Sequence, residues 1–127
     1  MEFLFIALGG AIGALLRYAT SILTALWWGT DFPWGTLTVN LVGSFFIGFL
    51  WQWFERFTLA PYIRTLVFVG ILGAFTTFSS YTLDSLRLFQ VGKVMPALVN
   101  VIGSNLLGLT AVYLGTLTAR QLLHHLT

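Results

Sequence analysis

Long apolar segments, separated by short polar connections, run through the whole chain. The segments cover residues 3–28, 35–54, 62–89 and 95–120. A helix needs about 20 mainly apolar residues to cross a bilayer, and each segment is long enough. The pattern predicts an all-α integral membrane protein with four transmembrane helices, forming a single transmembrane domain over residues 1–127.

Prolines and tryptophans stand at the ends of these segments. Each proline lies at or next to the start of the second, third or fourth segment, where the first-turn N–H of a helix has no intrahelical partner anyway. Indole rings prefer the headgroup level of a membrane, and no tryptophan lies in the middle of a segment, although core aromatics are an alternative interpretation. These boundary residues are Pro33, Pro61, Pro96, Trp27, Trp28, Trp34, Trp51 and Trp53.

Composition agrees with a membrane protein. Hydrophobic residues make up 57% of the chain and charged residues 8%, with a mean hydropathy of +0.90, whereas a soluble domain carries about 25% charged residues. The absence of cysteine excludes disulfides and thiolate metal sites. The first segment has neither a basic start nor a small-residue cleavage pattern, so we expect a retained helix rather than a signal peptide.

Basic residues are balanced between the two sides of the predicted membrane domain. Three of them fall on the side of the N-terminus and three on or near the opposite side, so the positive-inside rule assigns no orientation. The balance is either chance in a small count or a sign that the chain inserts in both orientations and pairs with an inverted copy. The first set is Arg56, Arg64 and Arg120, and the second is Arg17, Arg87 and Lys93.

Small residues spaced four apart occur on every segment. Helices in lipid associate by close backbone packing, which small residues permit. The repeated spacing predicts closely packed helices. The pairs are Gly9 and Gly13, Ser44 and Gly48, Gly70 and Ala74, and Ser104 and Gly108.

Candidate chemistry is confined to uncharged polar groups within the apolar segments. His124 and His125 lie at the C-terminus and are better explained as a solvated tail, and no catalytic triad, paired carboxylates or phosphate loop occurs, so we expect no enzyme. Asn40 in the second segment either lines a pathway or forms an interhelical hydrogen bond. Asn100 and Ser104 share one face of the fourth segment, while Asn105 is offset and is expected to face a neighbouring helix.

The third segment combines glycines with hydroxyl residues. Gly70 and Gly73 precede five hydroxyl residues within 76–82. Glycine and threonine have poor helix propensity, and the serine and threonine hydroxyls compete for backbone hydrogen bonds. We expect the helix to break near residues 73–79, freeing carbonyls suited to a small hard cation; an unbroken helix with back-bonded hydroxyls is the alternative. Phe78 and Tyr81 follow, and their ring edges can flank an anion or simply pack in a core.

Three stretches together resemble the bacterial fluoride channels of the CrcB/Fluc family. They are GGAIGALLRY at residues 9–18, GTLTVNLVG at 35–43 and GILGAFTTFS at 70–79. The resemblance covers the whole chain. It implies an antiparallel, dual-topology homodimer in the cell inner membrane, with two fluoride pores between the subunits and passive export that lowers cytoplasmic fluoride and its toxicity. It also implies a structural, non-transported sodium ion at the dimer centre.

The resemblance assigns roles to particular residues of this chain. Its pore or fluoride-path residues would be Asn40, Thr77, Phe78, Ser80, Tyr81 and Ser104. Arg17 and Asp84 would lie at a vestibule, and the backbone carbonyls of Gly73 and Thr76 would hold sodium. The chain departs from the family pattern at Tyr81, usually Phe, at Asp84, commonly Glu, and at Asn100, often Tyr or Ser.

Two other membrane functions fit the four segments less well. A small multidrug exporter is also a four-span dual-topology dimer, but it depends on a carboxylate within its first span, and residues 3–28 contain no acid. A purely structural membrane subunit would need no hydroxyl-rich, interrupted third segment.

Overall fold

The computed structural model describes residues 1–127 and is entirely helical. Four helices are long and apolar enough to cross a membrane, which confirms the predicted spans. The third of them, Pro61–Gln90, consists of several elements in succession. The elements are α1 (Glu2–Trp28), α2 (Trp34–Arg56), α3 (Pro61–Arg64), the π-helical η1 (Thr65–Leu72), α4 (Gly73–Phe75), α5 (Phe78–Gln90) and α6 (Val94–His125).

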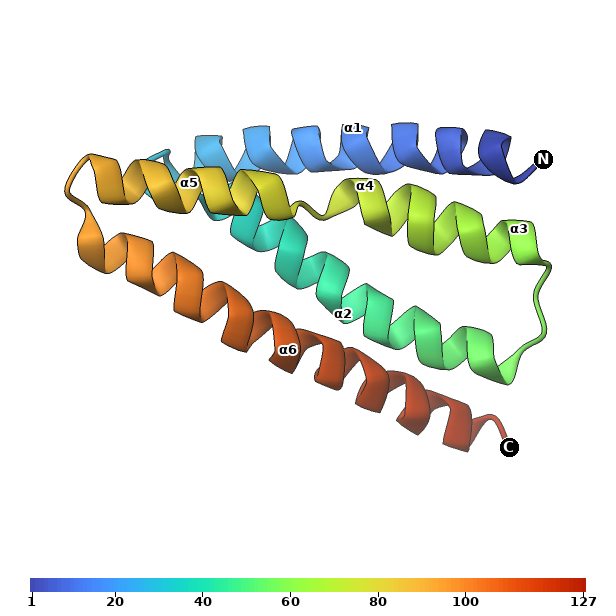
Figure 1. The fold of residues 1–127 in the computed structure, drawn as a ribbon. Helices are drawn as coiled ribbons and strands as arrows, with labels where there is room; N and C mark the ends of the chain where they lie inside the picture. Colours follow the sequence, from blue (N-terminus) through green and yellow to red (C-terminus); the bar gives the residue numbers. More distant parts are fainter.

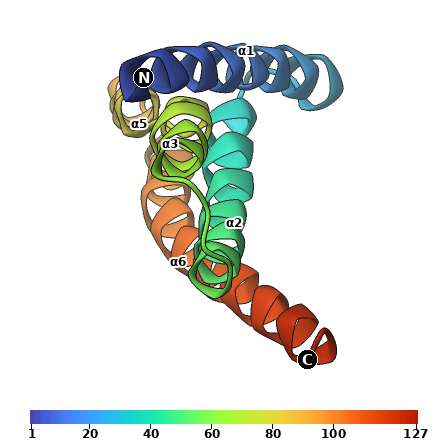
Figure 2. The ribbon, with the colours of Figure 1, turned by 90° about the vertical axis from the view of Figure 1, so that its right-hand side faces the viewer.

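The helices associate mainly as two neighbouring pairs. α1 packs along η1 and α4, α2 packs along α6, and α2 also contacts α1 and so joins the pairs. Both termini and the α2–α3 connection lie at one end of the molecule, while the α1–α2 and α5–α6 connections lie at the other (Figure 1). Viewed from that first end, α1 and the third span lie together above α2 and α6 (Figure 2). The alternating connections agree with four successive crossings.

Glycines form the closest helix contacts, as their spacing predicted. A Cβ added to Gly13 would collide with the Ile71 carbonyl of η1, and one added to Gly9 would lie 2.5 Å from the Leu66 carbonyl. A Cβ on Gly48 would collide with the Val112 carbonyl of α6. The small residues therefore let backbones touch in both pairs.

Most apolar side chains remain on the outside of the chain. Only 16 of the 127 residues are buried, and large exposed hydrophobic side chains occur on every span. In water this surface would be unfavourable, but lipid tails solvate it. The contacts that hold one chain together are consequently a few narrow seams rather than a broad core.

The third span changes its hydrogen bonding twice. The η1 segment has the wider π-helical winding, and at its end the Gly73 N–H donates to the Phe68 carbonyl, five residues back. Thr76 and Thr77 then leave helical geometry, with φ/ψ of −82°/156° and −149°/121°. The axis nevertheless bends by only 13° over the joined span. Helical hydrogen bonding is thus interrupted at Thr76 and Thr77, but the span keeps a single direction, so a break into two half-helices stays a prediction.

Candidate functional site

The extended residues are held by one asparagine from the neighbouring helix. The Asn40 Nδ2 donates to the Thr77 carbonyl at 2.9 Å, and the Thr77 N–H donates to the Asn40 Oδ1 at 2.8 Å. The side-chain amide therefore pairs with both backbone groups of one residue, as a neighbouring β-strand would. This clasp joins α2 to the third span and satisfies polar groups that would otherwise be unpaired deep in the membrane domain.

The interruption leaves four carbonyls, those of residues 73–76, without a backbone donor. In a continuous helix the Thr77 N–H would bond the Gly73 carbonyl, but here it bonds Asn40. The Ser80 N–H would bond the Thr76 carbonyl, but instead it donates to the Thr77 Oγ1 at 3.1 Å and caps α5. The two residues whose carbonyls were assigned to sodium are thus among the four, residues 73–76, whose carbonyls lack a backbone donor.

This arrangement fits a small hard cation and no softer metal. Oxygen ligands suit such ions, and Gly73 and Thr76 line the same groove. No cluster of three or more His, Cys, Asp or Glu side chains occurs that could hold another metal. The two assigned carbonyls alone do not complete a coordination shell, which needs further oxygens.

An open groove of about 330 Å³ gathers most of the predicted site residues. It lies between α2, the interrupted third span and α6, and all of its lining residues are uncharged. The predicted residues along it are Asn40, Gly73, Thr76, Thr77, Phe78, Tyr81 and Ser104. The remaining three, Ser80, Arg17 and Asp84, lie beside other cavities.

The two predicted aromatics stand together at the groove. The Phe78 and Tyr81 rings have centroids 5.6 Å apart and are tilted by 44°. Phe78 is 76% exposed at the start of α5, so it is free of core packing within one chain. The interpretation of Phe78 as an ordinary core aromatic is therefore wrong for the single chain.

Arg17 lines a different cavity from this groove. A second cavity, of about 410 Å³, is lined by Arg17 of α1, Thr36 of α2, and Thr77 and Ser80 of the third span. Thr77 lines both cavities. It is 7% exposed, so one buried residue belongs both to a groove without charged residues and to a cavity lined by Arg17.

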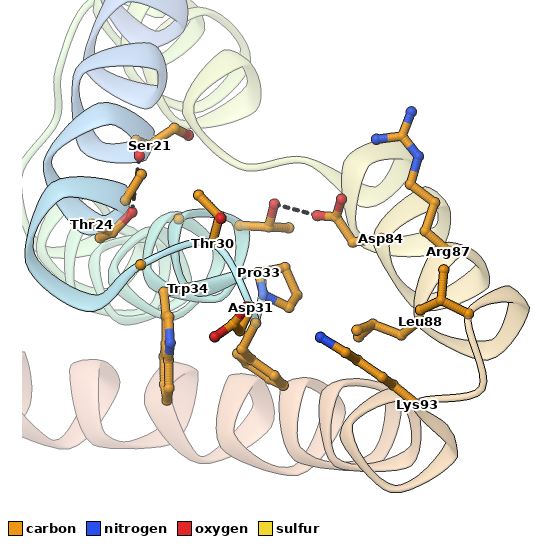
Figure 3. Close-up of a pocket in the computed structure, with 16 residues that line it drawn as sticks. Ser21, Thr24, Thr30, Asp31, Pro33, Trp34, Asp84, Arg87, Leu88 and Lys93 are labelled. Atoms are coloured by element: carbon orange, nitrogen blue, oxygen red, sulfur yellow. Dashed lines mark hydrogen bonds between the residues drawn. The ribbon is translucent and has the colours of Figure 1, made fainter.

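Asp84 lies in a third cavity, of about 400 Å³, at the end where the α1–α2 and α5–α6 connections meet. Its carboxylate accepts a 2.8 Å hydrogen bond from the Thr36 Oγ1 (Figure 3). Asp31, Arg87 and Lys93 also line this cavity (Figure 3). Arg17 and Asp84 thus occupy different cavities, which share Ser21 and Thr36 on their walls.

A buried polar chain connects α5 with α6. Asn100 is 1% exposed and donates to the Ser85 Oγ at 2.9 Å, while the Ser104 Oγ donates to the Asn100 Oδ1 at 3.3 Å. The predicted common face of Asn100 and Ser104 is therefore confirmed. No buried side-chain polar atom of the chain lacks a hydrogen-bond partner.

Sequence reasoning missed two polar residues of the groove. Asn105 contacts Tyr81 of α5, as its expected orientation toward a neighbouring helix allows, but its place beside the groove was not predicted. Ser44, predicted only as a packing residue, also lines the groove. The available signal was its spacing, because Ser44 lies one turn beyond Asn40 on α2.

Known proteins match this chain over nearly its full length. The family model described as "CrcB-like protein, Camphor Resistance (CrcB)" matches residues 4–116. A protein of Magnetococcus marinus named fluoride-specific ion channel FluC is 48% identical over 121 residues, covering 94% of this chain and 98% of the relative. The protein of that name from Salinibacter ruber is 46% identical over 117 residues, covering 91% of this chain and 86% of the relative. The one from Shewanella amazonensis is 48% identical over 112 residues, covering 88% of this chain and 90% of the relative.

These relatives are named as channels, which confirms the expectation that the chain is not an enzyme. The residues that the family model matches include all three stretches on which the resemblance rested. By sequence over almost all of its four helices, the chain belongs to the CrcB family.

Proposed function

We propose that this protein is a fluoride-specific ion channel whose fluoride path follows the uncharged groove. The observation that carries the proposal is the groove itself, which combines the Asn40 amide with two aromatic rings in a chain whose relatives bear the name fluoride-specific ion channel. The absence of an acid in the body of α1 speaks against a proton-coupled exporter, since Glu2 stands in its first turn.

The chemistry of the groove suits a small anion that must move quickly. Fluoride gives up strongly bound water only to N–H and O–H donors, and conduction requires that no site hold it too tightly. Asn40 uses one of its two amide hydrogens for Thr77, so the second is available to an anion. The positive edges of the Phe78 and Tyr81 rings can flank the anion without adding a full charge.

We place a structural sodium ion at the released carbonyls of Gly73 and Thr76. The redirected Thr77 and Ser80 amides support this assignment, because they leave these oxygens without their helical donors. When bound, sodium would neutralise the carbonyl end of α4 and fix the interruption as the junction of two half-helices. The fluoride path itself needs no ligand bond to the ion.

A second, inverted copy of the chain is the proposed cover for the groove. Lipid cannot satisfy polar groups at membrane depth, and Gly73 and Asn105 are exposed in the single chain. A two-fold partner would supply equivalent carbonyls to the sodium site and close one pore along each groove. The even division of six basic residues supports insertion in both orientations. In a cell inner membrane, such a dimer would release fluoride passively down its gradient.

Fluoride efflux from liposomes tests the central claim. Purified protein is reconstituted into vesicles loaded with potassium fluoride, and release is followed with a fluoride electrode. A potassium ionophore is added so that potassium leaves with fluoride and no membrane potential builds up to stop the efflux. We expect rapid fluoride release and little chloride release from matched vesicles. Protein-free vesicles provide the control. Equal release of the two anions, or none, would refute the proposal.

The sodium and the dimer need their own measurements. Exchange of all sodium for N-methylglucamine during purification should abolish flux, and returning sodium should restore it; unchanged flux would reject the ion. For topology, one variant carries a single cysteine at Thr30 and another a single cysteine at Thr127, positions at opposite ends of the helical bundle. The two variants are mixed and treated with a short thiol cross-linker. Antiparallel subunits should yield dimers from the mixed pair, whereas dimers from Thr30 pairs alone would indicate parallel subunits.

A further inference from the structure

The Tyr81 hydroxyl is fixed to the neighbouring helix by a residue that the proposed conduction path does not use. The Asn105 Nδ2 of α6 donates to the Tyr81 hydroxyl at 3.0 Å, and the hydroxyl donates to the Val101 carbonyl at 3.3 Å. Asn105 also donates to that same carbonyl at 2.7 Å. The three groups form a closed triangle between α5 and α6, beside the groove that Tyr81 lines.

The triangle accounts for every hydrogen that the two side chains can donate there. The amide has two N–H groups, one for the hydroxyl and one for the carbonyl, and the hydroxyl has a single O–H. Asn105 supplies the shorter of the two bonds to the Tyr81 hydroxyl. The far end of the ring is therefore held chiefly by Asn105, while its near end is fixed by α5.

From this geometry we infer that Asn105 is a positioning residue for the Tyr81 ring, a role that rests on the proposed fluoride conduction. Holding the hydroxyl fixes the ring plane, and the ring plane decides which way its positive edge points. The tilt of 44° between Phe78 and Tyr81 is maintained by this attachment. Asn105 lines the groove, but its amide already donates to Tyr81 and Val101, so it acts through Tyr81 rather than as a donor to the anion.

A purely structural role for Asn105 makes a different prediction. Its bond to the Val101 carbonyl lies within α6 and would be lost in any Asn105 variant, whatever stands at position 81. An effect that passes through Tyr81 must instead disappear when the hydroxyl is absent. The two roles are separated by a double-mutant cycle.

The experiment compares fluoride release by four proteins in liposomes: the natural chain, Asn105→Leu, Tyr81→Phe and the double variant. The net free energy of such a hydrogen bond corresponds to about a three- to fivefold factor in an equilibrium constant, and the conduction rate changes by that factor if the bond is fully lost along the path. We expect Asn105→Leu to slow fluoride release by that factor in the natural background. In the Tyr81→Phe background the same substitution should leave the rate within error of Tyr81→Phe alone.

Two matched variants serve as controls for non-specific effects of the substitution. Thr110→Val removes a polar group from the same exposed helix, where its hydroxyl bonds only the Leu106 carbonyl of α6 at 2.8 Å, and should leave release unchanged. Asn105→Gln keeps the amide and should recover part of the rate. All variants are compared by thermal unfolding, so that a lower amount of folded protein is corrected for.

The outcomes separate the inference from the proposed function. Equal slowing by Asn105→Leu in both backgrounds, or no slowing in the natural one, overturns the positioning role. Absence of fluoride release by the natural chain instead refutes the channel proposal itself.

Discussion

Replacing Asn40 by alanine tests the clasp that holds the interrupted span. The substitution removes two hydrogen bonds, of 2.9 and 2.8 Å, to the backbone of Thr77. At about 1 kcal/mol each, their loss lowers the free energy of unfolding by about 2 kcal/mol. Thr77 is buried, so its N–H and carbonyl would also lose their partners without gaining water, and the cost can rise to about 4 kcal/mol.

The loss should be measured against a neighbour that lines the same groove. Ser44→Ala, one turn along α2, removes a hydroxyl without removing any hydrogen bond to another element, and it should change stability by less than about 0.5 kcal/mol. Unfolding in mild detergent, followed by tryptophan fluorescence, reports both variants. The chain contains five tryptophans, three of them near the α1–α2 connection.

Two outcomes of this comparison are informative. A large loss for Asn40→Ala with little for Ser44→Ala supports the clasp. Equal small losses would mean that Thr76 and Thr77 stay extended without Asn40, and the explanation of the released carbonyls would be wrong.

Three further substitutions probe other contacts by the same unfolding assay. Gly13→Ala forces a Cβ into the Ile71 carbonyl and should cost about 1 to 3 kcal/mol, whereas Gly10→Ala, with nothing within 4 Å, should be neutral or stabilising; equal effects would refute the close seam. Thr77→Val removes the cap of α5 and should cost about 1 kcal/mol, with Thr77→Ser recovering it, and failure of that recovery would refute the capping role. Thr36→Val removes the 2.8 Å donor to Asp84 and should cost about 1 kcal/mol, and an Asp84→Ala background should cancel that cost.

The spans and their seams could be predicted from sequence because each depends on local information. Hydrophobic length sets a crossing, and the confirmed spans begin and end close to the predicted boundaries. Gly9, Gly13 and Gly48 were identified by spacing alone, and each lies against a carbonyl of another helix. Gly108 is the exception, since its nearest contact is the Ser44 Oγ at an ordinary 3.8 Å, so α2 and α6 are less tightly packed at that point.

The internal partners of the polar residues could not be predicted in this way. Helical periodicity places a residue on a face, but it does not say which atom of another helix lies opposite. Asn40 and Thr77 are 37 positions apart, and Asn105 and Tyr81 are 24 apart. The interruption at Thr76 and Thr77 has the same cause, because poor propensity permits an extended backbone while the Asn40 amide stabilises it.

The hydrogen bonds of the groove residues bear on how an anion could pass. Most hydroxyls there already donate within the chain: Thr76 to the Leu72 carbonyl at 3.0 Å and Ser104 to Asn100 at 3.3 Å. Ser44 and the second amide hydrogen of Asn40 remain without a partner in the chain. Two donors cannot replace the shell of water that fluoride gives up, so a bound anion must either keep some water or take donors from a second chain. This shortage is the physical reason for proposing that the groove conducts only when an opposed copy forms its other wall.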